Sequence, residues 1–158
     1  MQEETVIRMG NNVIANIRIM TKADKRTVME MMETFYNSPA VSTNGSQEIF
    51  EKDIENCVGD SPYLEGFIFE NGEEILGYGM IAKSFSTEFG KPCIWIEDLY
   101  IKPSYRGTGI GSSFFAYLEA KFTDCIFRLE VEPENTRAVC VYQKNGFTTL
   151  PYMEMKKE

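Results

Sequence analysis

The stretch of sequence that decides the fold is Arg106-Gly107-Thr108-Gly109-Ile110-Gly111, which lies between a strand-like run and a helix-like run. The strand-like run covers residues 94–101, and the helix-like run covers about 109–122 with apolar residues at a helical period. Glycines at alternate positions let backbone N–H groups approach a ligand closely. The first turn of a helix adds unpaired N–H donors and the positive end of the helix dipole. The stretch therefore predicts an anion cradle, most often one for phosphate, with the Arg106 guanidinium at its mouth.

The spacing of the glycines indicates which class of phosphate-binding motif the stretch belongs to. A P-loop requires Lys and then Ser or Thr after its second Gly, but here Ser112-Ser113 follows. A dinucleotide fingerprint would place its third Gly where Ser112 stands, although Glu130, 19 residues after Gly111, keeps this alternative open. The pattern that fits residues 106–111 is Arg-x-x-Gly-x-Gly.

A second motif follows about two dozen residues later. Residues 126–132 alternate apolar and charged side chains, which is typical of a strand with one wet face. A helix then begins at Glu134 or Asn135 and ends at Gly146, with a Tyr seven residues after the Asn and a final Asn-Gly-Phe. Together the two motifs resemble the acetyl-CoA loop and the second half of the core in the GNAT superfamily of N-acetyltransferases. The resemblance covers roughly residues 65–156, and more loosely the whole chain.

The predicted elements follow the order of a GNAT domain. They are a strand at 13–20, a helix capped by Thr21 that continues to Phe35, a helix at 46–58, strands at 64–70, 74–83 and 94–101, the glycine-loop helix, a strand at 126–132, a helix, and a last strand at 148–156. We expect one domain over residues 1–158 with a loosely held start at 1–12. The resemblance implies an α/β (α+β) fold: a mixed, mostly antiparallel central sheet that is splayed at a parallel strand pair and flanked by helices. The gap would lie between 94–101 and 126–132.

The resemblance also implies a binding mode for acetyl-CoA as co-substrate. The pyrophosphate would sit on the N–H groups of residues 106–112, and the backbones of Leu99 and Ile101 would pair with the pantetheine arm, with Tyr100 shaping the groove. Asn135 would bond the pantetheine amide, although a simple helix cap is the alternative. The implied cofactor-binding residues are Leu99, Tyr100, Ile101, Arg106, Gly107, Thr108, Gly109, Ile110, Gly111, Ser112, Asn135 and Tyr142.

The chain contains no histidine, so acid–base chemistry must use carboxylate, Tyr, Lys, Cys or water. An acceptor amine with a pKa of about 10.4 must lose a proton before it attacks, and Glu97 is the predicted base because partial desolvation would raise its pKa. Glu97-Asp98-Leu99 also resembles the strand of spermidine/spermine acetyltransferases in which a Glu is implicated. In a regular strand Asp98 would point to the opposite face. For either acid, a solvated or ion-paired strand residue is the alternative.

Tyr142 matches the family's general acid by position, seven residues after Asn135. Its hydroxyl would protonate the departing CoA thiolate, and ordinary packing against the sheet is the alternative. On the acceptor side we expect Tyr36, Phe85, Glu97 and Asp98 to bind substrate, although Tyr36 is equally an ordinary packed aromatic. The resemblance implies that an acetyl group is transferred to a primary amine of a small molecule or a peptide, and the identity of this acceptor stays open.

The bulk composition sets further expectations. A net charge of −8 disfavours a nucleic-acid partner and favours a cationic acceptor. The acidic start lacks the apolar region of a signal peptide, and no segment approaches about 18 apolar residues, so no membrane partner is expected. The cysteines show no C-x-x-C spacing, which favours reduced thiols, a cytoplasmic location and no metal site. A non-catalytic acyl-CoA-binding module and a homodimer both remain open.

Overall fold

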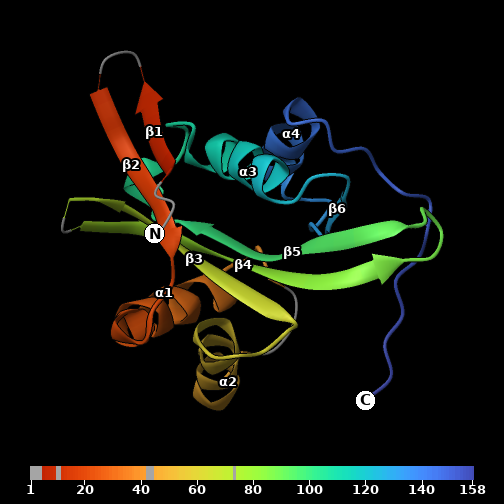
Figure 1. Cartoon of the computed structure of the whole chain (residues 1–158), viewed down its shortest axis with the longest axis horizontal. Coiled ribbons are helices and arrows are strands. Elements are labelled where there is room, and N and C mark those ends of the chain that lie inside the picture. The colour runs from red at the N-terminus through yellow and green to blue at the C-terminus, as the bar shows by residue number, and fades with distance from the viewer. Residues whose placement is uncertain (1–4, 10–11, 42–44, 73) are drawn as a thin grey trace.

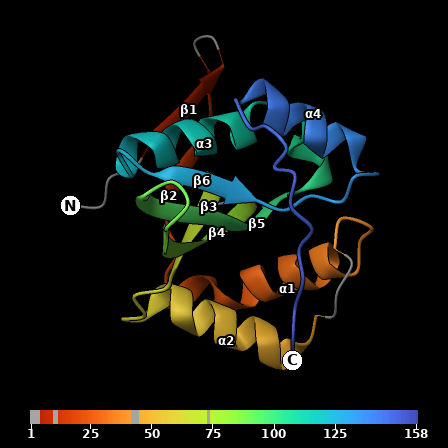
Figure 2. The ribbon, with the colours of Figure 1, turned by 90° about the vertical axis from the view of Figure 1, so that its right-hand side faces the viewer.

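The structure, a computed structural model, describes residues 5–9, 12–41, 45–72 and 74–158. A six-stranded sheet with the strand order β1-β2-β3-β4-β5-β6 forms the middle layer. Helices α1 and α2 cover one face of this sheet, and α3 and α4 cover the other (Figures 1 and 2). The elements are β1 (Thr5–Met9), β2 (Asn12–Ile19), α1 (Lys25–Tyr36), α2 (Gln47–Val58), β3 (Leu64–Asn71), β4 (Glu74–Ser86), β5 (Lys91–Ile101), α3 (Ile110–Lys121), β6 (Ile126–Leu129) and α4 (Thr136–Lys144).

The sheet is antiparallel from β1 to β5, and only β5 and β6 run parallel. The parallel pairing begins at Cys93↔Ile126 and ends at Ile96↔Leu129. Beyond this point β5 continues to Ile101, whereas the chain leaves β6 after Leu129. The predicted mixed sheet with a splayed parallel pair is therefore confirmed, and the second half of β5 has an unpaired edge toward the split.

Local signals placed the helix starts correctly. Asp24 accepts a hydrogen bond from the Thr21 backbone N–H at 2.8 Å, which completes a capping box at a short 3-10 turn (Lys22–Asp24) that leads into α1. The Ser46 hydroxyl accepts from the Ile49 N–H at 3.2 Å and caps α2. The cap at Thr21 and a helix start near Ser46 were predicted from the sequence, whereas the capping bond of the Ser46 hydroxyl is a finding of the structure.

The chain ends differ from the sequence prediction. A loosely held start had been expected at 1–12; within it Thr5–Met9 forms β1 and pairs with β2, while residues 1–4, 10 and 11 lie outside the described residues. The predicted last strand at 148–156 is wrong, because residues 147–158 adopt neither helix nor strand and the side chains of 151–158 are exposed. Pro151 has no N–H to give to a ladder, and β6 at the sheet edge offers a short partner. The segment instead extends past the sheet to the level of α1 and α2 (Figure 2).

Two apolar clusters, one on each face, hold the layers together. The α3 face is filled mainly by Phe67, Phe69 and Phe114, and the α1/α2 face by Met32, Ile68 and Tyr78 among others. Phe114 packs against Phe69 with ring centroids 5.1 Å apart. This aromatic packing lies directly over β4 at Gly79, where the absence of a side chain makes room for the ring.

We expect the Gly79→Ala variant to lower the free energy of unfolding by about 1–3 kcal/mol, as overpacking of a filled core does. An added Cβ would lie 2.7 Å from the Phe114 Cζ atom, so the ring or the strand must shift. Urea denaturation measures this effect, with Ser84→Ala on the exposed part of the same strand as the control. Equal unfolding midpoints for the two variants would contradict the packing described here.

Candidate functional site

The candidate site begins with a bulge in β5 at Glu97. In the ladder with β4, Met80 pairs with Asp98 and Ile81 pairs with Ile96, so Glu97 has no partner in β4. The extra residue changes which face the following side chains occupy. Ile96 packs in the α3-side cluster, whereas Tyr100, four residues on, packs in the α1/α2-side cluster. Without the bulge these two side chains would lie on the same face.

Asp98 lies inside the protein, with 4% of its surface exposed. Tyr78 donates a hydrogen bond to its Oδ2 at 2.7 Å, and Tyr36 donates to its Oδ1 at 2.9 Å. Burial raises the pKa of Asp98, and the two tyrosine hydroxyls oppose that rise. The structure thus brings Tyr36 and Asp98, both expected on the acceptor side, into contact, and their polar atoms bond each other and link α1 to the sheet.

The Asp98→Ala variant should unfold with a free energy about 2–4 kcal/mol lower, because two hydroxyls lose their acceptor inside the protein. Thermal and urea unfolding measure the loss. Replacement of the exposed Asp60 by alanine provides the control and should leave stability within about 0.5 kcal/mol. If both variants unfold alike, the tyrosine–carboxylate link does not stabilise the fold.

Glu97 itself is exposed at the point where β5 parts from β6. The surrounding protein nevertheless desolvates its carboxyl group, which raises its pKa, and the charges of Asp98 and Glu154 add to the rise. Glu130, the first residue after β6, has its pKa raised to about 7 by burial, by a hydrogen bond shared with Glu154 and by charge. Desolvation and the charges of Asp98 and Glu97 raise the pKa of Asp53 on α2 to about 6. The mouth of the split is therefore strongly acidic.

The glycine corner before α3 contains two residues with positive φ. Gly107 has φ 77° and Gly109, the N-cap residue of α3, has φ 90°, which are left-handed conformations that favour glycine. Gly109 has no side chain to cap the helix, so the first N–H groups of α3 are available to a ligand. The Thr108 hydroxyl donates to the Tyr105 carbonyl at 2.6 Å and stabilises the turn.

Arg106 adopts a more specific position than the sequence indicates. Its Nε donates to the Ile101 carbonyl at 2.8 Å, and its guanidinium lies 5.7 Å from the Tyr100 ring centroid. The side chain therefore ties the corner to the end of β5. The Tyr100 side chain is 6% exposed and packs in the α1/α2-side cluster, so only its backbone borders the split. Leu99 packs with the α3-side cluster together with Ile101.

Helix α4 contributes Asn135 and Tyr142. The Asn135 Oδ1 accepts from the Ala138 N–H at 3.3 Å, so the helix-cap role is confirmed and the Nδ2 group remains for a ligand. Half-buried Tyr142 packs edge-on against Phe115, with ring centroids 5.9 Å apart, and burial raises its pKa. At the other end of α4, Asn145 Nδ2 donates to the Ser112 hydroxyl at 3.0 Å, which fixes α4 against the first turn of α3.

Phe85 lies apart from these residues. It pairs with Pro92 near the β4–β5 turn, at the opposite end of the ladder from Ile101, and is 62% exposed. The loop expected at 84–91 is shorter than predicted, because β4 extends to Ser86 and β5 begins at Lys91.

Two acidic neighbours of Glu97 were not predicted from the sequence. Asp53 belongs to no motif, and Glu154 lies in the segment that was expected to form a strand.

These features define a split-sheet domain whose glycine corner has the geometry of an anion site, and comparison with known proteins identifies the family. Residues 27–147 match the model of the acetyltransferase (GNAT) family, and the chain belongs to this family.

In the described ranges no helix has the length and apolar character needed to cross a membrane. The same ranges contain no group of three or more His, Cys, Asp or Glu arranged to hold a metal ion.

Curated relatives and solved structures agree with this assignment. The chain is 34% identical over 107 residues to thialysine N-epsilon-acetyltransferase of Sus scrofa, a match that covers 61% of this chain and 62% of the relative. The Caenorhabditis elegans protein of the same name is 32% identical over 116 residues, covering 72% of this chain and 69% of the relative. The chain thus spans less than two thirds of the mammalian relative's length.

Two solved structures support the fold alone. A possible acetyltransferase from Clostridium difficile 630 superposes with a TM-score of 0.77 at 19% identity, covering 92% of this chain and 97% of that one. Aminoglycoside N-acetyltransferase AAC(6')-Iy in complex with CoA gives a TM-score of 0.76 at 17% identity, covering 96% and 99%.

Proposed function

We propose that this protein is an acetyl-CoA-dependent N-acetyltransferase that moves the acetyl group to a primary amine of a small molecule or peptide. The observation that carries this proposal is the unpaired edge of β5 at residues 97–101, which a short 3-10 turn (Pro103–Tyr105) connects to the glycine corner. A linear co-substrate with an anionic end matches this arrangement, because its amide arm pairs with the strand edge while its phosphates bind the N–H groups at the helix start.

The cofactor would contact the corner and the strand edge in sequence. The pyrophosphate binds the N–H groups of residues 106–112, and the pantetheine arm pairs with the backbones of Leu99 and Ile101. The Asn135 Nδ2 donates to a pantetheine carbonyl while its Oδ1 caps α4. A thioester carbonyl held near a backbone N–H gains stabilisation as it becomes tetrahedral.

The chemistry is direct attack in a ternary complex. Glu97 takes the proton of the acceptor ammonium, directly or through water, and the neutral amine attacks the thioester carbon. The tetrahedral intermediate then expels the CoA thiolate, to which Tyr142 donates its hydroxyl proton. The nitrogen of the new amide releases the extra proton it gained on attack, and this proton restores the Tyr142 hydroxyl. The raised pKa of Glu97 supports its role as a base, because its conjugate acid is then closer to neutral pH.

A cationic acceptor fits the charge of the split. Neighbouring carboxylate charges contribute to the raised pKa values of Asp53, Glu97 and Glu130, and the chain carries a net charge of −8. A positively charged amine relieves this repulsion, whereas nucleic acid does not. The mammalian and nematode relatives are named for thialysine, and the solved enzyme for aminoglycosides, which supports a small amine as substrate.

Thiol release from acetyl-CoA across a library of primary amines tests the activity and identifies the acceptor. Turnover with cationic small amines is the expected result. Stabilisation by acetyl-CoA in a thermal shift assay, without turnover of any amine, would instead favour a non-catalytic acyl-CoA-binding module. Stabilisation by NAD and not by acetyl-CoA would overturn the binding mode itself.

Two further properties belong to the proposal. The four cysteines are free thiols, which supports a reducing compartment such as the cytoplasm.

The segment 147–158 contains Tyr152, Met153 and Met155, whose side chains are 64%, 86% and 86% exposed to solvent, and β6 ends the sheet with an open edge. These exposed groups support a homodimer, which light scattering of the full chain against one ending at residue 147 would test.

A further inference from the structure

A second guanidinium lies over the glycine corner, and it comes from α4. The Nη2 atom of Arg137 is 3.5 Å from the position that a Cβ atom on Gly107 would occupy. Gly107 is in a left-handed conformation and has no Cβ, so the guanidinium approaches the backbone of the corner itself. Residues 30 positions apart in sequence thus place a cation beside the unfilled N–H donors of α3.

This cation is not neutralised by the protein. Among the residues that the structure describes, Arg137 forms no ion pair within 4.0 Å, and its side chain is exposed. Glu132 and Glu134 precede it closely in sequence, yet neither is paired with it. Arg106, in contrast, already donates its Nε to the Ile101 carbonyl at 2.8 Å. Arg137 therefore keeps its full set of donors available beside the corner.

The helix that carries Arg137 is fixed at both ends. The Asn135 side chain caps its first turn, and Asn145 bonds Ser112 in the first turn of α3 at 3.0 Å. The base of the Arg137 side chain is thereby held at a constant place relative to the corner. A guanidinium with its planar fork of donors is well suited to bind two phosphate oxygens at once.

We propose that Arg137 binds the pyrophosphate of acetyl-CoA from α4, opposite the N-terminus of α3, so that the cofactor bridges the two helices. This inference rests on the proposed function and adds a residue to its cofactor site. The guanidinium supplies positive charge to the corner of an acidic protein, where a dianionic pyrophosphate is otherwise repelled by the net charge of −8. Because α4 also carries Tyr142, a bound pyrophosphate fixes the helix that presents the proposed general acid.

The experiment compares Arg137→Gln and Arg137→Lys with the unaltered protein for three ligands: acetyl-CoA, acetyl-3'-dephospho-CoA and S-acetylpantetheine. We expect Arg137→Gln to raise the Kd and the KM of the first two about tenfold, since both contain the pyrophosphate. S-acetylpantetheine, which has no phosphate, should bind equally to all three proteins. Arg137→Lys should recover part of the affinity, and kcat at saturating cofactor should stay within about twofold.

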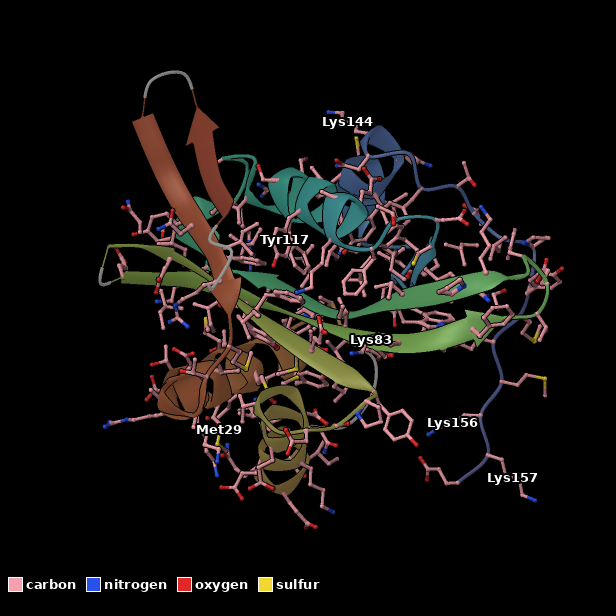
Figure 3. The ribbon with its side chains drawn as sticks, viewed as in Figure 1. Met29, Lys83, Tyr117, Lys144, Lys156 and Lys157 are labelled. Atoms are coloured by element: carbon pink, nitrogen blue, oxygen red, sulfur yellow. The ribbon has the colours of Figure 1, made fainter. Side chains whose placement is uncertain are left out.

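Lys144→Gln is the matched control, because Lys144 is an exposed cation on the same helix and points away from the sheet (Figure 3). It should leave all three affinities unchanged. Unaltered affinity in Arg137→Gln, or a loss confined to acetyl-CoA and absent with the dephospho compound, would overturn the inference. Failure of the unaltered protein to bind acetyl-CoA at all would overturn the proposed function as well, so the two failures are distinguishable.

Discussion

Replacement of Glu97 by glutamine is expected to lower kcat/KM for the amine by at least about a hundredfold, the usual contribution of a positioned general base. Glutamine preserves the shape of the side chain and its ability to accept a hydrogen bond, but it does not take up a proton. Since Glu97 is exposed and unpaired with β4, the substitution should not unfold the protein. Steady-state thiol release measures the rate, and the KM for acetyl-CoA should change little.

The pH dependence separates a base from a binding residue at this position. Burial first, and then the charges of Asp98 and Glu154, raise the pKa of Glu97 above its ordinary value. Because the base acts when ionised, kcat/KM of the unaltered enzyme should fall as the pH drops through this raised pKa. In Glu97→Gln this acid limb should disappear, and in Glu154→Gln it should move to lower pH.

Glu119→Gln serves as the control, because Glu119 is an exposed carboxylate on the outer side of α3. Its rate and pH profile should match those of the unaltered enzyme. An unchanged acid limb in Glu97→Gln would assign the base to another group, and Glu130, with a pKa of about 7, is the next to replace.

The features that sequence analysis predicted correctly are those that local chemistry determines. The glycine turn before α3, the helix cap at Thr21 and the start of α2 near Ser46 each depend on residues within one turn of the chain. The parallel pairing of β5 and β6 followed from the length of the connection between them. Such signals are independent of the rest of the fold, so one sequence suffices to find them.

The features that were missed depend on contacts between distant segments. The bulge at Glu97 arises from the register between β4 and β5, and no residue type in this stretch signals an extra position. The bonds from Tyr36 and Tyr78 to Asp98 join residues 62 and 20 positions apart. Arg137 reaches Gly107 only because α4 packs beside α3. A prediction from alternation along one strand could not find these arrangements.

The Tyr142→Phe variant should lower kcat by about ten- to a hundredfold, with little change in the KM of either substrate. A thiolate with a pKa of about 8.5, by analogy with Cys, is a fair leaving group, so the loss of the acid should cost less than the loss of the base. Phenylalanine retains the contacts with Phe115 and Phe147, whose ring centroids lie 5.9 and 6.0 Å from that of Tyr142. The fold should therefore persist, which unfolding curves would verify.

Tyr117→Phe is the matched control for this hydroxyl. Tyr117 is 7% exposed and packs between α3 and the sheet, with its ring centroid 5.6 Å from that of Phe67, outside the proposed site (Figure 3). Loss of the Tyr117 hydroxyl should leave kcat unchanged.

Burial raises the pKa of Tyr142, so the acid stays protonated across the neutral range and its ionisation limits the rate only at high pH. The basic limb of the kcat profile should accordingly vanish in Tyr142→Phe and persist in Tyr117→Phe. Equal kcat values for the two variants would mean that water protonates the thiolate and that Tyr142 serves packing alone.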